Sequence, residues 1–578
     1  MKTSPQAVQV RTTFRIAVSG VLLLAGFIGV GWRLFSLQVV QAADLSRRAE
    51  RQHEKSVPLE GERGTVYDRQ GSILAANVDV ASVYAVPALI GNRAEAAAGL
   101  ARVLDVGAEG IRRKLESEKG FVWIDRKVNP SVAERIRGLG IDGVDLLNES
   151  QRFYPKRFLL GHLLGFAGLD NRGLEGLELT YDKVLRGEKG WLVLERDALG
   201  RAVFPKGQSY FAPSRGKDII LTIDEGIQHI VETELDAVMG RTRAIGASVI
   251  VMDPRTGEIL ALAVRPDFNP NRISGQDPDQ WRNRTVTDAY EPGSTIKIVT
   301  AAAALNEGVA KTDEVIYCEE GRMKVAGGIV RDHEKEGYLT FPQVIQRSSN
   351  IGTIKIAMRV GERSLYQYLR AFGFGEKSGI DIGGESAGTL RDPSGWSRRS
   401  LASISIGQEI AATPVQVVTA AAAVANGGWL VRPHLVSEIR NADGSVVKRF
   451  MPEVRRQAVS KETARQMMEI LEGTVSKGGT GEQAAIAGYR VAGKTGTAQK
   501  IDPVTRRYSM QDSVSSFVGI VPADDPRIVV LVVIDQPEGF SWGSMVAAPV
   551  FREIAPPILR HLGVAPHTQE RILVTLAR

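Results

Sequence analysis

The sequence of 578 residues has a single cysteine, Cys318, which cannot form an internal disulfide. An oxidising compartment is therefore neither required nor excluded, and we expect Cys318 to be a packing residue. No cysteine and histidine spacing resembles a metal site, and no glycine-rich run fits a phosphate-binding pattern. The sequence therefore predicts neither a metal ion nor an organic cofactor.

The sequence also lacks a block of charge of one sign. Its net charge is +7 and its pI is near 9.3, but the lysines and arginines are scattered among 66 acidic residues. Proteins that bind nucleic acid concentrate basic residues on one face or segment, so we expect no nucleic-acid partner. The length and the 43% hydrophobic content indicate several folded domains rather than disorder.

Only one apolar run is long enough to cross a bilayer. Residues 16–32 carry no charge, and residues 34–40 extend the run beyond Arg33. At about 1.5 Å per residue, a helix over 16–40 spans a hydrocarbon core of roughly 30 Å, and the long Arg33 side chain can reach the interface. We expect a cytoplasmic tail at 1–15 and a transmembrane anchor at 16–40.

A cleaved signal peptide is the alternative for this segment, because basic residues precede the apolar core and residues 40–42 could form a cleavage site. Retention is favoured because the apolar region is longer than a signal core of about 7 to 15 residues. Basic residues flank both ends of the span, so charge alone leaves its orientation open.

A serine and a lysine lie three residues apart in the heptapeptide Glu-Pro-Gly-Ser-Thr-Ile-Lys at residues 291–297. The Pro-Gly pair and the apolar run at 295–304 predict that Ser294 lies in the first turn of a buried helix. Residues i and i+3 share a helix face, so the amine of Lys297 can reach the hydroxyl of Ser294. A serine is a poor nucleophile unless a base takes its proton, and this pair is a candidate for both roles.

The spacing alone does not distinguish this pair. Ser214 with Lys217 has the same spacing in a stretch that contains proline and glycine, and Ser445 with Lys448 follows a turn sequence. We expect both to be solvated loop residues. The pair at Ser294 is distinguished by two later motifs, Ser-Ser-Asn at 348–350 and Lys-Thr-Gly-Thr at 494–497.

These three motifs in this order are typical of penicillin-binding proteins and class A β-lactamases. Because of these motifs, the chain resembles a class B penicillin-binding protein, a monofunctional peptidoglycan D,D-transpeptidase of the division type. The resemblance extends along nearly the whole chain. Further stretches similar to family motifs are Arg-Gly-Thr-Val-Tyr-Asp-Arg-Gln-Gly at 63–71, Arg-Phe-Tyr-Pro at 152–155, Gly-Leu-Glu-Gly-Leu-Glu at 173–178, Gly-Gln-Glu-Ile at 407–410 and Thr-Pro-Val-Gln at 413–416.

An α+β fold is expected, with a β-lactamase-like transpeptidase domain whose antiparallel sheet lies between helices. The sheet is built from both ends of that domain, by β-rich runs at 247–252, 258–263, 517–521 and 528–534. Helical segments between them are expected at 294–306, 414–425 and 461–475.

We expect the transpeptidase domain at 216–562, a C-terminal tail at 563–578, and an elongated pedestal domain of the dimerisation type at 41–215. The resemblance assigns the pedestal to positioning and partner contact. Charged residues of its motifs are expected to form structural ion pairs: Arg63, Asp68, Arg69, Arg152, Glu175 and Glu178.

The resemblance implies a role for each site residue. Ser294 attacks the penultimate D-alanine of a stem peptide ending in D-Ala-D-Ala, and Lys297 takes its proton. Burial of Lys297 and the like charge of Lys494 are both expected to lower the pKa of Lys297. The other catalytic residues are Ser348, Asn350 and Lys494, the substrate-binding residues are Ser349, Thr495, Gly496 and Thr497, and the oxyanion donors are the backbone N–H groups of Ser294 and Thr497.

The acyl ester is then expected to pass to an amine of a neighbouring stem peptide, with β-lactams as covalent inhibitors. A D,D-carboxypeptidase, a membrane β-lactam sensor and a divisome scaffold with a vestigial pocket are the alternatives. The chain has no Glu-x-x-Leu-Asn element between Asn350 and Lys494 as in class A β-lactamases, and no His-Glu-x-x-His protease element for a sensor. The complete set of motifs argues against a vestigial pocket.

A division role is expected, with an elongation enzyme of the lateral wall as the alternative. The resemblance implies a polytopic lipid II polymerase and other divisome membrane proteins as partners. It also implies a single-pass protein of the cytoplasmic (inner) membrane, with its catalytic domain in the periplasm or otherwise outside the cytoplasm.

Overall fold

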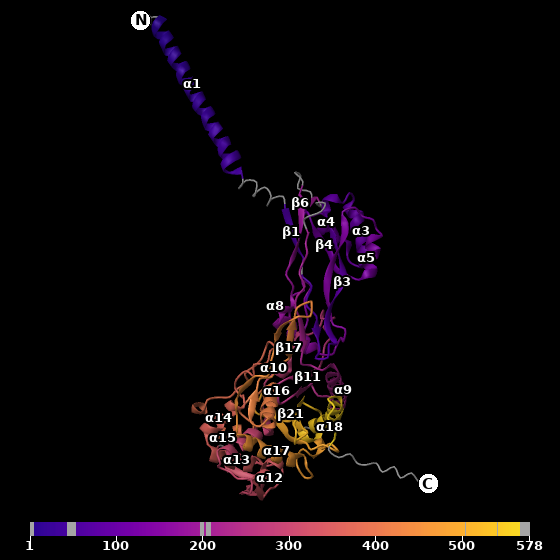
Figure 1. The fold of residues 1–578 in the computed structure, drawn as a ribbon, viewed down its shortest axis with the longest axis vertical. Helices are drawn as coiled ribbons and strands as arrows, with labels where there is room; N and C mark the ends of the chain where they lie inside the picture. Colours follow the sequence, from indigo (N-terminus) through magenta and orange to yellow (C-terminus); the bar gives the residue numbers. More distant parts are fainter. Residues whose placement is uncertain are drawn as a thin grey trace, which may run out of the picture. The chain divides into compact units, whose positions relative to one another are not determined.

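The computed structural model describes residues 5–42, 54–59, 61–196, 202–203, 210–326, 328–502, 504–539 and 542–566 (Figure 1). The chain divides into two compact units. The smaller unit comprises residues 1–60, 79–150 and 188–214, and the larger unit comprises 61–78, 151–187 and 215–578. This differs from the expected linear division at residue 215, because two segments of the expected pedestal belong to the larger unit.

The N-terminal helix α1 (Pro5–Phe35) continues into a π-helical turn, η1 (Ser36–Val40). Together these two elements contain the 28 residues Thr13–Val40, a stretch that is long and apolar enough to cross a membrane. A helix of that length measures about 42 Å at 1.5 Å per residue, which exceeds a hydrocarbon core of roughly 30 Å. An apolar helix near the N-terminus can also belong to a signal sequence, so retention of the span stays a prediction.

In the smaller unit, a helical layer packs on a short antiparallel sheet. Residues 81–85 of β3 (Ile73–Ala85) pair with β4 (Val122–Val128), and Val83, Leu100 and Ile124 belong to one apolar core. The helices are α3 (Arg93–Leu104), α4 (Ala108–Leu115) and α5 (Pro130–Arg137). A second sheet pairs β6 (Gly190–Arg196) with β1 (Glu54–Leu59), β7 (Ala202–Val203) and β8 (Tyr210–Phe211).

The larger unit is built on a five-stranded antiparallel sheet of order β11-β10-β22-β21-β20. The strands are β10 (Gly246–Met252), β11 (Ile259–Arg265), β20 (Ala492–Ile501), β21 (Tyr508–Val521) and β22 (Ile528–Asp535). The prediction of a sheet assembled from both ends of the domain is therefore confirmed. The strands β10, β11 and β22 are mostly apolar and buried along nearly their whole length, as expected for strands covered on both faces.

Helices cover both faces of this sheet. Because successive side chains point to opposite faces, Val249, Phe517 and Val530 pack against α9 (Glu225–Thr242) and α18 (Gly543–His561). Ile250, Val518 and Leu531 belong to the other core, with α16 (Pro414–Ala425). The helices α13, α14 and α15 lie on the opposite side of the unit from α9 and α18 (Figure 1).

Local sequence signals explain where the helices of that second layer begin. Thr413 and Gln416 form a capping box at the start of α16, and the side chain of Ser460 caps α17 (Lys461–Val475). Both helices have the predicted bounds. The other helices of the layer are α11 (Lys297–Asn306), α12 (Phe341–Gln346), α13 (Asn350–Val360), α14 (Glu362–Ala371) and α15 (Ser400–Ser405).

The remaining elements are short. They are β2 (Val66–Tyr67), η2 (Pro87–Leu89), β5 (Val144–Phe153), α6 (Gly161–Leu164), α7 (Gly176–Thr180), α8 (Asp182–Leu185), β9 (Asp218–Leu221), η3 (Pro278–Gln280), α10 (Arg284–Thr287), η4 (Gly293–Ile296), β12 (Val315–Tyr317), η5 (Glu319–Gly321), β13 (Arg322–Val325), β14 (Gly328–Arg331), β15 (Tyr338–Thr340), η6 (Pro393–Gly395), β16 (Trp429–Val431), β17 (Val436–Arg440), β18 (Val446–Arg449), β19 (Val454–Gln457) and η7 (Glu482–Ala484).

A buried ion-pair network explains why two pedestal segments join the larger unit. Glu178 accepts hydrogen bonds from Arg63 Nε at 2.7 Å and from Arg152 Nε at 2.5 Å, and Arg63 Nη1 donates to Asp182 at 2.6 Å. Arg63, Arg152 and Glu178 are all buried. One carboxylate in the segment 151–187 therefore binds guanidinium groups from both segments.

The predicted structural ion pairs are thus confirmed for Arg63, Arg152 and Glu178. Arg69 makes a half-exposed pair with Glu258. The Asp68 carboxylate accepts hydrogen bonds from backbone N–H groups instead, those of Gln70, Ser72 and Glu225. Glu175 forms no ion pair with any residue that the structure describes.

We expect Glu178→Ala to lower the free energy of unfolding of the larger unit by about 3 to 5 kcal/mol, because it removes the carboxylate shared by two buried guanidinium groups. Urea unfolding measures the change. The matched control is Glu134→Ala, which removes the exposed partner of Arg137 and should cost less than about 1 kcal/mol. Equal losses in the two variants would contradict a structural role for the buried network.

Candidate active site

Ser294 lies in η4, a single 3-10 turn that leads directly into α11. The predicted position at the start of a buried helix is confirmed, although the turn is tighter than an α-helix. Ser294 is half-buried, whereas Lys297 is fully buried. No backbone hydrogen bond of the described residues is donated by the N–H of Ser294, as expected in a first helical turn.

The segment 407–410 holds this turn in place through hydrogen bonds and close backbone packing. Gly293 N donates to Gly407 O at 3.2 Å, and a Cβ on Gly407 would lie 2.0 Å from Gly293 O. The Glu291 carboxylate accepts hydrogen bonds from Glu409 N at 2.9 Å and from Tyr508 Oη at 3.1 Å. Only glycine at position 407 allows the two backbones to approach this closely.

The amine of Lys297 is directed at the Ser-Ser-Asn motif. Its Nζ donates to Ser348 O at 2.6 Å, to Asn350 Oδ1 at 2.8 Å and to Ser348 Oγ at 3.2 Å. Among the described residues, no hydrogen bond joins Lys297 to the hydroxyl of Ser294. The spacing of three residues therefore does not by itself produce the expected contact, because three acceptors on the 348–350 segment hold the amine.

Lys494, on strand β20, also bonds the hydroxyl of Ser348. Its Nζ donates to Ser348 Oγ at 3.0 Å and to Thr495 O at 3.2 Å, and its side chain is fully buried. The Ser348 hydroxyl is therefore bonded to two lysine amines. Since a hydroxyl has one proton and two lone pairs, it can accept from one amine while it donates to the other when that amine is neutral.

The surroundings favour the neutral form of both amines. Burial lowers the pKa of Lys297 from its ordinary 10.5 to about 7, and the Asp332 carboxylate acts in the opposite direction. Burial, with the charge of Lys297 as a second cause, lowers the pKa of Lys494 well below its ordinary value. Burial is the main cause for both amines, as expected for Lys297, whereas the expected effect of the Lys494 charge is not among the causes of the lowered pKa of Lys297.

Asp332 is a residue that sequence reasoning missed. Its carboxylate accepts hydrogen bonds from Ser349 Oγ at 2.6 Å, Asn350 N at 2.5 Å and Ile351 N at 3.0 Å. It thus binds the free N–H groups at the start of α13, where a negative charge is also favoured by the helix dipole. Asp332 fixes the orientation of the motif that holds Lys297.

Ser349 has the geometry of a helix cap. Its hydroxyl accepts from Gly352 N at 3.0 Å and donates to Asp332, and the residue is 2% exposed. Ser348, just before it, has a φ of 57° in the left-handed region. Both the carbonyl and the hydroxyl of Ser348 accept from Lys297 in this conformation.

The Lys-Thr-Gly-Thr motif lies on β20, which packs against η4. A Cβ on Gly496 would lie 2.3 Å from Ser516 Oγ and 3.1 Å from Pro292 O, so a glycine lets the strand pass beside the serine turn. The hydroxyl of Thr495 bonds that of Thr480 at 3.1 Å, and Thr497 Oγ1 accepts from Gly543 N at 3.1 Å.

The structure brings the predicted site residues together in the larger unit. The turn of Ser294 contacts β20, and Ser348 links Lys297 to Lys494. The alternative pair at Ser445 lies instead in an exposed turn, where its hydroxyl donates to Asp443 at 2.6 Å. Within the described ranges, no group of three or more metal-ligating side chains is found. The arrangement places Ser294 one helical turn before a buried amine with a lowered pKa, a combination that suits acyl transfer.

Comparisons with known proteins agree with this geometry. Residues 247–555 match the penicillin binding protein transpeptidase domain, and residues 58–221 match the penicillin-binding protein dimerisation domain. The chain is 36% identical to stage V sporulation protein D of Bacillus subtilis (strain 168), over 99% of this chain and 88% of that protein. It is 32% identical to peptidoglycan D,D-transpeptidase FtsI of Escherichia coli (strain K12), over 94% of this chain and 91% of that protein.

A solved structure is similar over a comparable length. Penicillin binding protein 3 of Mycobacterium tuberculosis, in complex with aztreonam, has a TM-score of 0.69 and 28% identity, and the similarity covers 88% of this chain and 98% of that one. The similarity to stage V sporulation protein D covers nearly the whole chain and therefore includes both matched domains. The chain therefore belongs to the penicillin-binding protein transpeptidase family, as a class B member.

Proposed function

We propose that this penicillin-binding transpeptidase cross-links peptidoglycan through an acyl ester on Ser294, with Lys297 as the general base. The observation that carries the proposal is the buried pair of amines, Lys297 and Lys494, on either side of the Ser348 hydroxyl and next to the turn of Ser294. A base has to be neutral before it accepts a proton, and a pKa of about 7 allows this near neutral pH.

In the proposed reaction, Ser294 Oγ attacks the carbonyl carbon of the penultimate D-alanine, and its proton passes to Lys297. The peptide bond to the terminal D-alanine breaks, and that amine leaves with a proton delivered through Ser348. The acyl ester is then attacked by an amine of a second stem peptide. This step forms the new peptide bond and breaks the ester, and a proton from the attacking amine passes to Ser294 Oγ, so that no cofactor is consumed.

The walls of the site suit the two ends of the donor peptide. Lys494 and the motif residues Thr495, Gly496 and Thr497 would bind the terminal carboxylate, while Asn350 holds the substrate amide. The N–H groups of Ser294 and Thr497 would stabilise the oxyanion. The hydroxyl of Ser349 caps α13, and its backbone N–H and C=O groups bond Val344 and Thr353, so Ser349 would serve substrate binding by fixing the position of Ser348 and Asn350.

β-Lactams are the proposed covalent inhibitors, because they present a strained amide to the same serine. The M. tuberculosis relative in complex with aztreonam supports this. A D,D-carboxypeptidase would share the acyl step and differ only in the use of water as acceptor. Analysis of the released products with a stem peptide and an added amine acceptor separates the two activities.

We assign the enzyme to septal wall synthesis outside the cytoplasm, anchored by the span within Thr13–Val40. A polytopic lipid II polymerase and other divisome membrane proteins are the proposed partners. We propose that the expected pedestal at 41–215 positions the transpeptidase domain, although its segments 61–78 and 151–187 belong to the same compact unit as that domain. Midcell localisation of a fluorescent fusion would support this assignment, and a lateral-wall pattern would instead indicate the elongation machinery.

Covalent labelling tests the nucleophile. With fluorescent penicillin, we expect the full-length protein to form a stable adduct and Ser294→Ala to form none, because the attacking oxygen is removed. The matched control is Ser445→Ala, which changes the serine of another serine-lysine pair at an exposed turn and should label like the unchanged protein. A stable adduct on Ser294→Ala would contradict the assignment of Ser294 as the nucleophile.

The pH dependence of acylation tests the base. Only neutral Lys297 accepts the proton, so the second-order rate constant with penicillin should rise with pH through a midpoint of about 7. The Asp332 carboxylate favours charged Lys297, so Asp332→Asn should lower the pKa of Lys297 and move the midpoint to lower pH.

The control for that measurement is Glu334→Gln, which removes a carboxylate that is 65% exposed, two residues further on. Solvent screens this charge, so the midpoint should stay in place. A midpoint that does not move in Asp332→Asn, or that moves to higher pH, would show that Lys297 is not the titrating base.

A further inference from the structure

The hydroxyl of Thr480 connects the two walls of the active site, which are the segment 346–350 and strand β20. Thr480 lies outside the three motifs, in a loop of sequence Lys-Gly-Gly-Thr-Gly at 477–481 that follows α17. Its backbone N–H and its hydroxyl both donate to Gln346 O, at 3.1 and 3.2 Å. The hydroxyl also bonds Thr495 Oγ1 at 3.1 Å, on β20.

The direction of these hydrogen bonds gives the Thr480 hydroxyl two roles. The carbonyl of Gln346, the last residue of α12, can only accept, and the last carbonyls of a helix have no partner within it. The single proton of the Thr480 hydroxyl is therefore donated to Gln346 O, and the Thr480 oxygen accepts the proton of the Thr495 hydroxyl. A continuous chain of hydrogen bonds thus runs from β20 to the end of α12.

Close backbone contacts fix the loop 477–481 at the end of α17. Gly481 N donates to Thr474 O at 2.9 Å, and a Cβ on Gly479 would lie 2.2 Å from the same oxygen. Only glycine at position 479 allows this approach. The Thr480 hydroxyl is therefore held between the two walls by the backbone on both sides of it.

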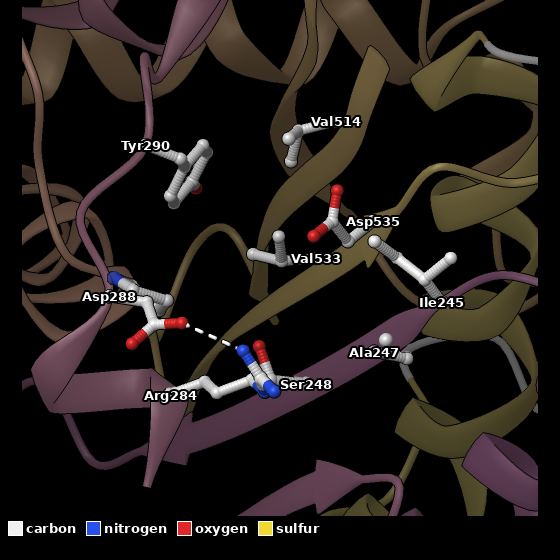
Figure 2. A pocket seen from close by; sticks show the side chains of 11 residues that line it. Ile245, Ala247, Ser248, Arg284, Asp288, Tyr290, Val514, Val533 and Asp535 are labelled. Carbon is white, nitrogen blue, oxygen red and sulfur yellow. Dashed lines mark hydrogen bonds and ion pairs between the residues drawn. The ribbon is translucent and has the colours of Figure 1, made fainter. Parts of the chain in front are cut away.

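A cavity of about 120 Å³ lies between the central sheet and the segment that precedes the serine turn. Figure 2 shows Asp288 and Tyr290 on one side of this cavity and Asp535, at the end of β22, on the other. The sheet and this segment do not pack directly together there. The contacts that space the two walls are therefore those nearer the site.

A second contact joins the same walls directly, between Lys494 Nζ and Ser348 Oγ at 3.0 Å. Gln346 lies two residues before Ser348, and Thr495 directly follows Lys494, so both links cross the same gap. In the proposed reaction Ser348 moves a proton and Lys494 binds the substrate carboxylate, so their own hydrogen bond changes during the reaction. The chain through Thr480 contains no group that gains or loses a proton in that reaction, and it can keep the walls at a constant distance.

We propose that Thr480 is a positioning residue that holds Ser348 and Lys494 at the distance required for proton transfer. Thr480 acts through Gln346 and Thr495 rather than by contact with the substrate. This role rests on the proposed function, because it depends on proton transfer through Ser348. A displacement of about 1 Å in a catalytic group can lower a rate about a hundredfold, so loss of the chain should be visible in the rate of acylation.

Acylation of the full-length protein in detergent tests this role. The rate of reaction with fluorescent penicillin, measured over a range of concentrations, separates the dissociation constant of the first complex from the rate constant of acylation. Thr480→Val keeps the shape of the side chain and removes both hydrogen bonds of its hydroxyl. We expect the acylation rate constant to fall about tenfold or more and the dissociation constant to change less than about threefold. Thr480→Ser keeps the hydroxyl and should retain the rate constant within about twofold.

The matched control is Thr474→Val, because the Thr474 hydroxyl is buried beside the same loop and makes no hydrogen bond among the described residues. This variant should leave the acylation rate constant unchanged. An unchanged rate constant in Thr480→Val, an equal fall in Thr480→Ser or in Thr474→Val, or a rise in the dissociation constant alone would each overturn the role of Thr480. Ser294→Ala distinguishes that result from failure of the proposed function, since an adduct on this variant would overturn the nucleophile itself.

Discussion

Two buried lysine amines that meet at one serine hydroxyl are the constraint on which the site depends. Lys297 and Lys494 each donate to Ser348 Oγ, at 3.2 and 3.0 Å, and both are fully buried. Two ammonium groups in that environment would repel each other with little screening by solvent. Both effects favour a neutral amine, which is what a base that activates a serine nucleophile requires.

The surrounding elements are arranged to keep that contact in place. Asp332 and Ser349 fix the start of α13, and this orients Ser348 and Asn350 toward Lys297. On the other side, Gly496 lets strand β20 pass close to the serine turn and brings Lys494 within reach. Asp332, Ser349 and Gly496 thus control how Ser348 and the two lysine amines are placed.

Much of the fold could be predicted because its signals are local. The capping residues Thr413 and Ser460 mark the starts of α16 and α17, whose bounds were predicted to the residue, and the apolar runs of β10 and β22 predict covered strands. The three motifs predicted which residues meet in the site, because each motif has an unusual combination of residue types at a characteristic place in the chain.

What could not be predicted depends on contacts between distant segments. Asp332 lies in a loop between short strands, and nothing in its neighbourhood shows that it caps a helix that begins at Asn350. The segment 61–78 joins the larger unit because Arg63 pairs with Glu178, a contact across more than a hundred residues. Likewise, the spacing of Ser294 and Lys297 predicts that the amine can reach the Ser294 hydroxyl. It does not predict the competing acceptors that direct the amine toward Ser348.

Direct titration of Lys297 tests the central claim. In protein with ¹³C-labelled lysine, and with Lys297→Gln to assign the signal, NMR reports the charge of the amine from the chemical shift of Cε. The account predicts that Lys297 loses its proton with a midpoint of about pH 7. The contrary result is that both Lys297 and Lys494 stay charged up to about pH 9, close to the ordinary pKa of lysine. The two amines at the Ser348 hydroxyl would then supply no neutral base, and the account would be contradicted.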